Sequence, residues 1–211
     1  MPSTSKNQHF TYLLPPGWVR IDLRGDLEPQ VEQVLTRHAE RIPRDQQAKV
    51  RAFAGPRLLS GVREAAAGGA YDLVVPVPRQ HYETISTFVV APLAWPDGID
   101  AIDGIAAIAA SDSSAQLAEI GGLVALRTQA DVARADEGPV IQAARREGLE
   151  GDIPTVATSR RVQYFIGDPE RPRDWITALF SIPLADNEQA LEWVTAETEL
   201  FDSVMKSLRF F

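Results

Sequence analysis

Three histidines are the residues of this chain best suited to chemistry, because imidazole transfers protons and binds metals near neutral pH. They are His9, His38 and His81, and they stand far apart in the sequence. His81 lies in the polar RQHYE segment at residues 79–83, between two expected strands, and loops positioned by a sheet often carry function. With Glu83 and a distant serine it would form a nucleophile–base–orienter set, but no particular serine is indicated. We therefore treat His81 and Tyr82 as candidates for lining a ligand pocket.

Other signatures of catalysis are missing from the sequence. It contains no Walker, dinucleotide-binding, zinc-protease or serine-hydrolase motif, and no cysteine, which excludes disulfides and thiolate chemistry. The acid pairs Asp100/Asp103 and Asp136/Glu137 are local, whereas glycosidase chemistry needs two acids facing each other across a cleft. We predict no catalytic residues, no metal site and no cofactor, hence a protein that is not an enzyme.

A basic stretch between residues 37 and 63 is the clearest charged feature. Its cations are Arg37, Arg41, Arg44, Lys49, Arg51, Arg57 and Arg63. A surface for RNA or an acidic partner is one interpretation, and an ordinary solvated face is the other, because acids interrupt the stretch. The net charge of −8 and the lack of interleaved aromatic residues argue against nucleic-acid binding. Arg37, Arg41, Arg51 and Arg57 are our candidates for contact with a protein partner.

Trp18, Trp175 and Trp193 are candidates for a pocket or an interface, with the hydrophobic core as the alternative. Trp193 lies off the apolar stripe of the last expected helix, so it is predicted to be exposed and to bind a partner. Trp175 opens an apolar strand and is a further candidate for lining a ligand pocket.

Length and composition indicate an ordinary globular protein. The 211 residues are 45% hydrophobic and 24% charged, which suits one domain; we expect a flexible tail over residues 1–8 and a single globular domain over residues 9–211. The absence of cysteine fits a reducing compartment. No signal peptide or run of ~20 apolar residues is visible. We predict a cytoplasmic protein without membrane insertion.

Two helices are predicted near the start, over residues 27–42 and 44–67, from apolar residues at three-four spacing. Asp26 is a plausible N-cap of the first, and Pro43 ends it. Gly55-Pro56 is expected to kink or split the second. A further helix is predicted over residues 99–110, capped by Asp97 or Asp100, and a last helix is predicted with Asp186 or Asn187 as its cap. The last helix carries the clearest buried stripe, which consists of Leu191, Val194, Thr198, Phe201, Met205 and Leu208.

Strands are predicted where the apolar period changes to two. Residues 10–14 and 18–23, joined by Pro15-Pro16-Gly17, suggest a hairpin or bent ribbon, and Gly121-Gly122 suggests a tight hairpin. Other expected strands cover residues 71–77, 83–94, 154–166 and 175–184. Residues 83–94 are apolar on both faces, which is typical of a central strand covered on both sides. We predict an α+β fold with a mainly antiparallel sheet flanked by helices, an α/β/α sandwich.

Several short segments resemble a family of uncharacterised actinobacterial proteins. They are LPPGW at residues 14–18, SRRVQY at 159–164, Trp175 with Phe180-Ser181, LFDSVM at 200–205 and LRF at 208–210. The closing strand–turn–strand–helix also resembles the PsbP-like α/β/α sandwich, which a photosystem extrinsic protein shares with a Ran-binding import factor. This resemblance implies a binding or assembly role, and some actinobacterial relatives imply a link to type VII secretion. No metal-binding or Ran-binding motif of the better-known relatives is matched.

Three alternatives follow for the function. The first is a non-enzymatic partner-binding or assembly protein, accessory to type VII secretion, with an unidentified protein partner or as a homo-oligomer. The second is a small-ligand-binding module whose pocket lies between the sheet and the closing helix. The third is an enzyme that uses aspartate, serine and histidine residues without a recognisable motif.

Overall fold

The computed structural model describes residues 10–40, 43–77, 86–133, 158–168, 170–171, 174–184 and 188–211. The helices are α1 (Leu27–Ala39), α2 (Arg44–Ala67), α3 (Ala101–Ser111) and α5 (Glu188–Lys206). The strands are β1 (Phe10–Thr11), β2 (Trp18–Asp22), β3 (Asp72–Pro76), β4 (Thr87–Pro92), β5 (Gln116–Ile120), β6 (Leu123–Ala133), β7 (Thr158–Gly167), β8 (Ile176–Leu184) and β9 (Arg209–Phe210).

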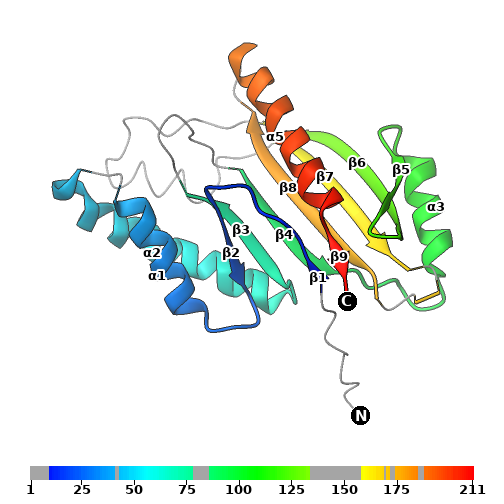
Figure 1. Ribbon diagram of the computed structural model, residues 1–211, viewed down its shortest axis with the longest axis horizontal. Helices are drawn as coiled ribbons and strands as arrows, with labels where there is room; N and C mark the ends of the chain where they lie inside the picture. Colours follow the sequence, from blue (N-terminus) through cyan, green and yellow to red (C-terminus); the bar gives the residue numbers. More distant parts are fainter. Residues whose placement is uncertain are drawn as a thin grey trace.

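Seven of these strands form one sheet in the order β2-β3-β4-β8-β7-β6-β5, and every neighbouring pair is antiparallel. Strands β1 and β9 form a separate antiparallel pair. Figure 1 shows α1 and α2 at the β2 end of the sheet, α3 at the β5 end, and α5 lying across β7 and β8. The predicted α+β fold, with an antiparallel sheet flanked by helices, is confirmed.

Strand β4 shows why helices are needed on both faces of the sheet. Phe88 and Val90 belong to the core cluster that contains the residues of α5. Val89 and Ala91, which alternate with them, pack against the cluster that contains α1 and α2. Because successive side chains of a strand point to opposite faces, a strand apolar at every position must be covered twice. The predicted central position of this strand is confirmed, since it pairs with β3 and β8.

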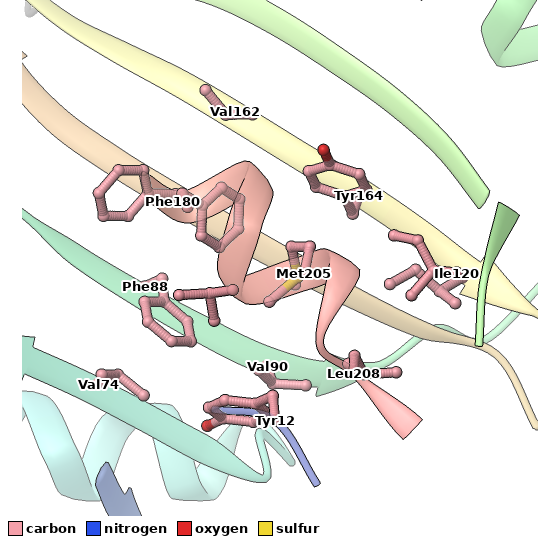
Figure 2. Close-up of a cluster of buried hydrophobic side chains, with 14 of the residues drawn as sticks. Tyr12, Val74, Phe88, Val90, Ile120, Val162, Tyr164, Phe180, Met205 and Leu208 are labelled. Atoms are coloured by element: carbon pink, nitrogen blue, oxygen red, sulfur yellow. The ribbon is translucent and has the colours of Figure 1, made fainter. Parts of the chain in front are cut away.

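Helix α5 covers one face through aromatic packing (Figure 2). The ring of Phe201 stacks on Phe180 with 4.7 Å between centroids and lies 5.4 Å from Phe88. Met205 is fully buried below them. Leu191, expected in the same stripe, is 55% exposed. That part of the prediction is wrong because the first turns of α5 extend past the end of β8 (Figure 1). The apolar spacing begins at Leu191, before the helix reaches the sheet.

Helices α1 and α2 cover the opposite face at the β2 end. Val31 and Val34 of α1 and Val62 of α2 are buried there against Ile21 and Val75 of the sheet. Of the two outcomes expected at Gly55-Pro56, a kink or a split, the split does not occur, because the helix runs from Arg44 to Ala67 with Pro56 inside it. Packing of its second half on the sheet and of its middle on α1 outweighs the hydrogen bond that the proline removes.

Of the two alternatives for residues 10–14 and 18–23, a hairpin or a bent ribbon, the hairpin is wrong. Strand β1 pairs with β9 at the C-terminus, and β2 pairs with β3. Pro15 and Pro16 lack the N–H groups that a ladder needs. The pairing of β1 with β9 therefore ends before the two prolines, and the pairing of β2 with β3 begins after them.

The other predicted hairpin, around Gly121-Gly122, is confirmed. Strands β5 and β6 pair on either side of the two glycines, whose φ angles are +61° and +82°, a conformation that other residues rarely adopt. A Cβ on Gly121 would also lie 2.9 Å from the carbonyl oxygen of Leu208.

Helix α3 covers the β5 end of the face that α1 and α2 share. Its Ala101 and Ile105 pack on Phe165 of β7 and on Trp175. Of the two aspartates expected to cap it, Asp100 does so, since its Oδ1 accepts a hydrogen bond from the backbone N–H of Ile102 at 2.9 Å.

No helix in the described part of the chain is long and apolar enough to cross a bilayer.

The packing of α3 can be tested by making the same glycine-to-alanine substitution in two helices. A Cβ at Gly104 of α3 would lie 2.2 Å from Cζ3 of Trp95, whereas one at Gly61 of α2 would meet no atom within 4 Å. We expect Gly104→Ala to lower the free energy of unfolding by about 1–3 kcal/mol through overpacking. Gly61→Ala should raise it by about 0.5–1 kcal/mol through helix propensity. Urea denaturation followed by tryptophan fluorescence measures both, and effects of equal sign would contradict the packing of α3.

Candidate functional site

A partly open cavity of about 300 Å³ lies between α1, α2 and the adjoining parts of β3 and β4. Its lining is mostly apolar and consists of Val34, Leu35, His38 and Ala39 of α1, Val50, Arg51, Ala54 and Leu58 of α2, Val75 and Pro76 of β3, and Thr87 of β4. A concave apolar site with a few polar groups is the usual form of a small-molecule site.

The cavity lies beside the first half of α2, which contributes little to the core. Residues that α2 places in or against the core cluster all come from its second half, from Leu58 onward. In the first half, Val50 and Ala54 line the cavity instead. Alanine at positions 39 and 54 leaves room between the helices that a larger side chain would fill.

His38 is held against the backbone at the cavity wall. Its Nε2 lies 3.0 Å from the carbonyl oxygen of Pro76, and because a carbonyl only accepts, we assign the proton to Nε2. Burial lowers the pKa of His38 below its usual value, although the bond to Pro76 opposes this. In the neutral ring, Nδ1 is therefore a hydrogen-bond acceptor, and it makes no hydrogen bond to any described residue.

Arg51 brings the positive charge to the cavity. Its Nη1 donates to Oε1 of Glu32 at 2.5 Å and its Nη2 to Oγ1 of Thr36 at 2.9 Å, both on α1. Its side chain is 37% exposed and that of Glu32 is 60% exposed. Arg63 makes a similar bond to Glu28, also on α1, at 2.6 Å, but does not line the cavity.

Of the predicted partner-binding residues that the structure describes, Arg51 alone lines this cavity. Arg37 is exposed on α1. Arg57 lies over the ring of Phe53 at 3.7 Å and donates to its carbonyl oxygen. Arg41 lies outside the described residues.

The predicted pocket residues are not brought together in the described structure. His81 and Tyr82 lie outside the described residues. Trp175 is fully buried beneath α3, where it packs edge-on against Trp95 and donates to the carbonyl oxygen of Asp168. Trp175 therefore belongs to the core beneath α3 and does not line the cavity. Trp193 is 41% exposed on α5, as expected.

The cavity also lies on a different face from the one expected for a pocket. Between the sheet and α5, the space around Trp18, Phe88 and Phe180 amounts to only about 10 Å³, because aromatic rings fill it. Nothing in the sequence marks His38 or the residues around it as the lining of a cavity.

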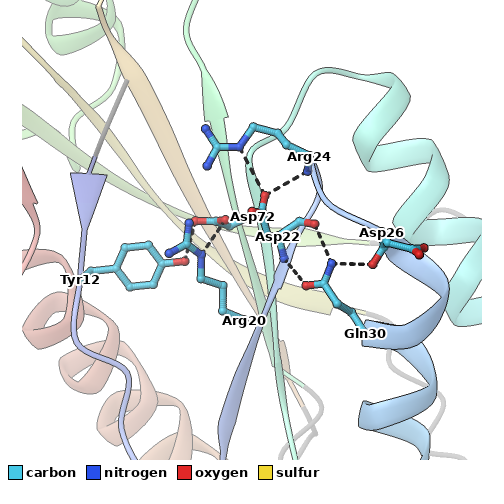
Figure 3. Close-up of polar contacts among 7 residues, drawn as sticks. All are labelled: Tyr12, Arg20, Asp22, Arg24, Asp26, Gln30 and Asp72. Atoms are coloured by element: carbon cyan, nitrogen blue, oxygen red, sulfur yellow. Dashed lines mark hydrogen bonds and ion pairs between the residues drawn. The ribbon is translucent and has the colours of Figure 1, made fainter. Parts of the chain in front are cut away.

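A buried carboxylate forms a second polar cluster (Figure 3). It lies near the β2 edge of the sheet, on the face that α5 covers. Asp72 of β3 is fully buried; Tyr12 Oη donates to its Oδ2 at 3.0 Å and Arg20 Nε to its Oδ1 at 2.7 Å. Burial raises the pKa of Asp72, although Arg20 and Tyr12 lower it. Because these bonds are internal, we assign the cluster a structural role: it joins the segment after β1 to β2 and β3.

A related network ties α1 to β2 (Figure 3). The side chain of Gln30 accepts from the backbone N–H of Asp22 at 2.8 Å and donates to the carbonyl oxygens of Asp22 and Asp26 at 3.0 and 2.8 Å. The N-cap Asp26 makes no side-chain cap bond of its own. Gln30 thus fixes the start of the helix whose far end lines the cavity.

Three further hydrogen bonds join α5 to the sheet and to Ser86, which precedes β4. Asp202 accepts from Arg127 Nε of β6 at 2.9 Å and from Tyr164 Oη of β7 at 2.8 Å. Ser86 donates to Glu197, and both side chains are buried. Among the described residues, no three side chains of metal-binding type lie together.

Comparisons with protein-family models, curated proteins and solved structures found no match to the chain.

The bond from Tyr12 to Asp72 makes a testable contribution to stability. Tyr12→Phe should lower the free energy of unfolding by about 1.5–3 kcal/mol near neutral pH, the usual worth of a bond to a charged group. The hydroxyl lowers the pKa of Asp72 by favouring the ionised form, so its contribution is present above that pKa and is lost as the pH falls through it. Urea denaturation at a series of pH values measures the difference between the two proteins.

Tyr71→Phe is the matched control, because the hydroxyl of Tyr71 makes no hydrogen bond to any described residue. Its small effect should not change with pH over the acidic range. A loss for Tyr12→Phe that is equally large at every pH would contradict an ionised Asp72 as the acceptor.

Proposed function

We propose that the protein binds a small apolar molecule in the cavity between α1, α2 and the β3–β4 part of the sheet. The observation that carries the proposal is the cavity itself: about 300 Å³ of open space with mostly apolar walls. Apolar side chains such as Val50 gain by leaving water, and an apolar ligand covers them as a core would.

A ligand of ordinary metabolite size fits this space. The cavity's volume of about 300 Å³ falls at the lower end of the range for small-molecule sites. The polar groups of the lining come from both helices and from the sheet, namely His38, Arg51 and Thr87. A few polar groups among apolar walls orient a ligand without dominating its binding.

Filling the cavity tests this function. The probes are 1-octanol, octanoate and octylamine, which share an eight-carbon tail and differ in the head group, titrated by calorimetry. We expect at least one probe to bind the wild-type protein. Ala54→Phe should weaken that binding at least about tenfold, because the new ring occupies the space of the tail. Binding of none of the three probes to the wild-type protein would contradict the proposal.

The matched control is Ala52→Phe, which makes the same change on the exposed side of α2 and should leave binding unchanged. Thermal unfolding of both variants shows whether they fold. Equal weakening by both substitutions would mean that the tail does not bind in the cavity.

Binding of a protein partner is a second candidate function. It is favoured by Leu191 and Trp193, which are 55% and 41% exposed on the first turns of α5. The resemblance to the PsbP-like sandwich stays a prediction, and it favours a binding protein over an enzyme. A cytoplasmic protein accessory to type VII secretion, which we also propose, would likewise act by binding a partner. Sedimentation velocity over a range of concentrations tests self-association: a dimer that Trp193→Ser abolishes supports this candidate, and a dimer unaffected by that change contradicts it.

A further inference from the structure

The charged groups of the cavity restrict the kind of ligand that it can hold. Among the residues that the structure describes, Arg51 and His38 are the ionisable ones of the lining, and none of its members is an aspartate or glutamate. Burying a charge is costly unless an opposite charge pairs with it. A cationic head group would have to lie beside the guanidinium of Arg51, whereas an anionic one would pair with it.

Arg51 can donate further hydrogen bonds, and its ion-pair partner Glu32 can be replaced by a ligand. A guanidinium group carries five N–H donors, and two bonds, to Glu32 and Thr36, are seen here. The side chain of Glu32 is 60% exposed, so water can solvate it after release, and exposed ion pairs contribute little to stability. A carboxylate from the ligand can form two parallel bonds with the guanidinium, the strong geometry for this pair.

The rest of the lining suits an uncharged tail. Val34, Leu35, Val50, Ala54, Leu58 and Val75 supply apolar surface from both helices and the sheet. The volume of about 300 Å³ lies at the lower end of the range for small-molecule sites, which suits a medium-length chain or a single ring with a short substituent.

We propose that the ligand is a monocarboxylate with an apolar body, bound with its carboxylate on Arg51 in place of Glu32 and its body between α1, α2 and β3. This inference rests on the proposed function, because it names the ligand class of the same cavity. It makes Glu32 a competitor of the ligand, a role that a purely structural ion pair would not have.

Calorimetric titration with octanoate, 1-octanol and octylamine tests the class. Octanoate should bind the wild-type protein about 10- to 100-fold more tightly than 1-octanol, the usual difference for a charge-assisted hydrogen bond. Octylamine, which is cationic at neutral pH, should bind more weakly than 1-octanol. Arg51→Gln should remove the advantage of octanoate and leave 1-octanol binding unchanged.

Two further variants separate the proposed role of Arg51 from a structural one. Arg63→Gln removes the neighbouring interhelical ion pair, with Glu28, and should leave the preference for octanoate unchanged. Glu32→Gln removes the competing carboxylate and should strengthen octanoate binding several-fold. A Glu32→Gln variant that binds octanoate more weakly than the wild type would overturn the competition.

The titration also distinguishes failure of this inference from failure of the proposed function. If 1-octanol binds as tightly as octanoate and Ala54→Phe weakens both, the carboxylate class is wrong and the cavity remains a ligand site. If none of the three compounds binds the wild-type protein, the proposed function falls together with the ligand class.

Discussion

A sheet whose central strands are apolar on both faces cannot face water on either side, and the arrangement of the helices follows from this constraint. In β4, Phe88 and Val90 need cover on one side, and Val89 and Ala91 need it on the other. Helix α5 meets the first requirement with a continuous stripe, in which Phe201 fits between sheet aromatics. The opposite face is shared by α1 and α2 at one end and α3 at the other.

The cavity arises where this shared cover is least complete. The second half of α2 packs on the sheet through residues such as Val62, but its first half presents small side chains, and the space beside Ala54 stays open. Interhelical ion pairs, including Arg51 with Glu32, cross between α1 and α2 beside that space, and Gln30 bonds the start of α1 to β2. One arginine thus both joins the helices and brings charge to the cavity.

The sequence predicted the elements better than their partners. Period-two and three-four spacing located the strands and helices, and α2 begins and ends at the predicted residues. The pairing of β1 with β9 escaped prediction because it joins the two ends of the described chain, and local patterns carry no information about such distant contacts. Trp175 was predicted to line a pocket for a related reason, because an apolar residue at the start of a strand suits a pocket and a core equally. In the structure it packs against Gly167 and Trp95 in the core.

The cavity itself was not predictable, because it depends on how far two helices stand from a sheet, which no spacing of residues encodes. The proposed role of the cavity is to hold an apolar carboxylate ligand. The most direct test is NMR of the protein saturated with octanoate, with nuclear Overhauser effects measured between the ligand chain and protein methyl groups. We predict contacts to Val34, Leu35, Val50, Leu58 and Val75, which line the cavity. Contacts confined to methyl groups elsewhere, or none at all, would contradict it.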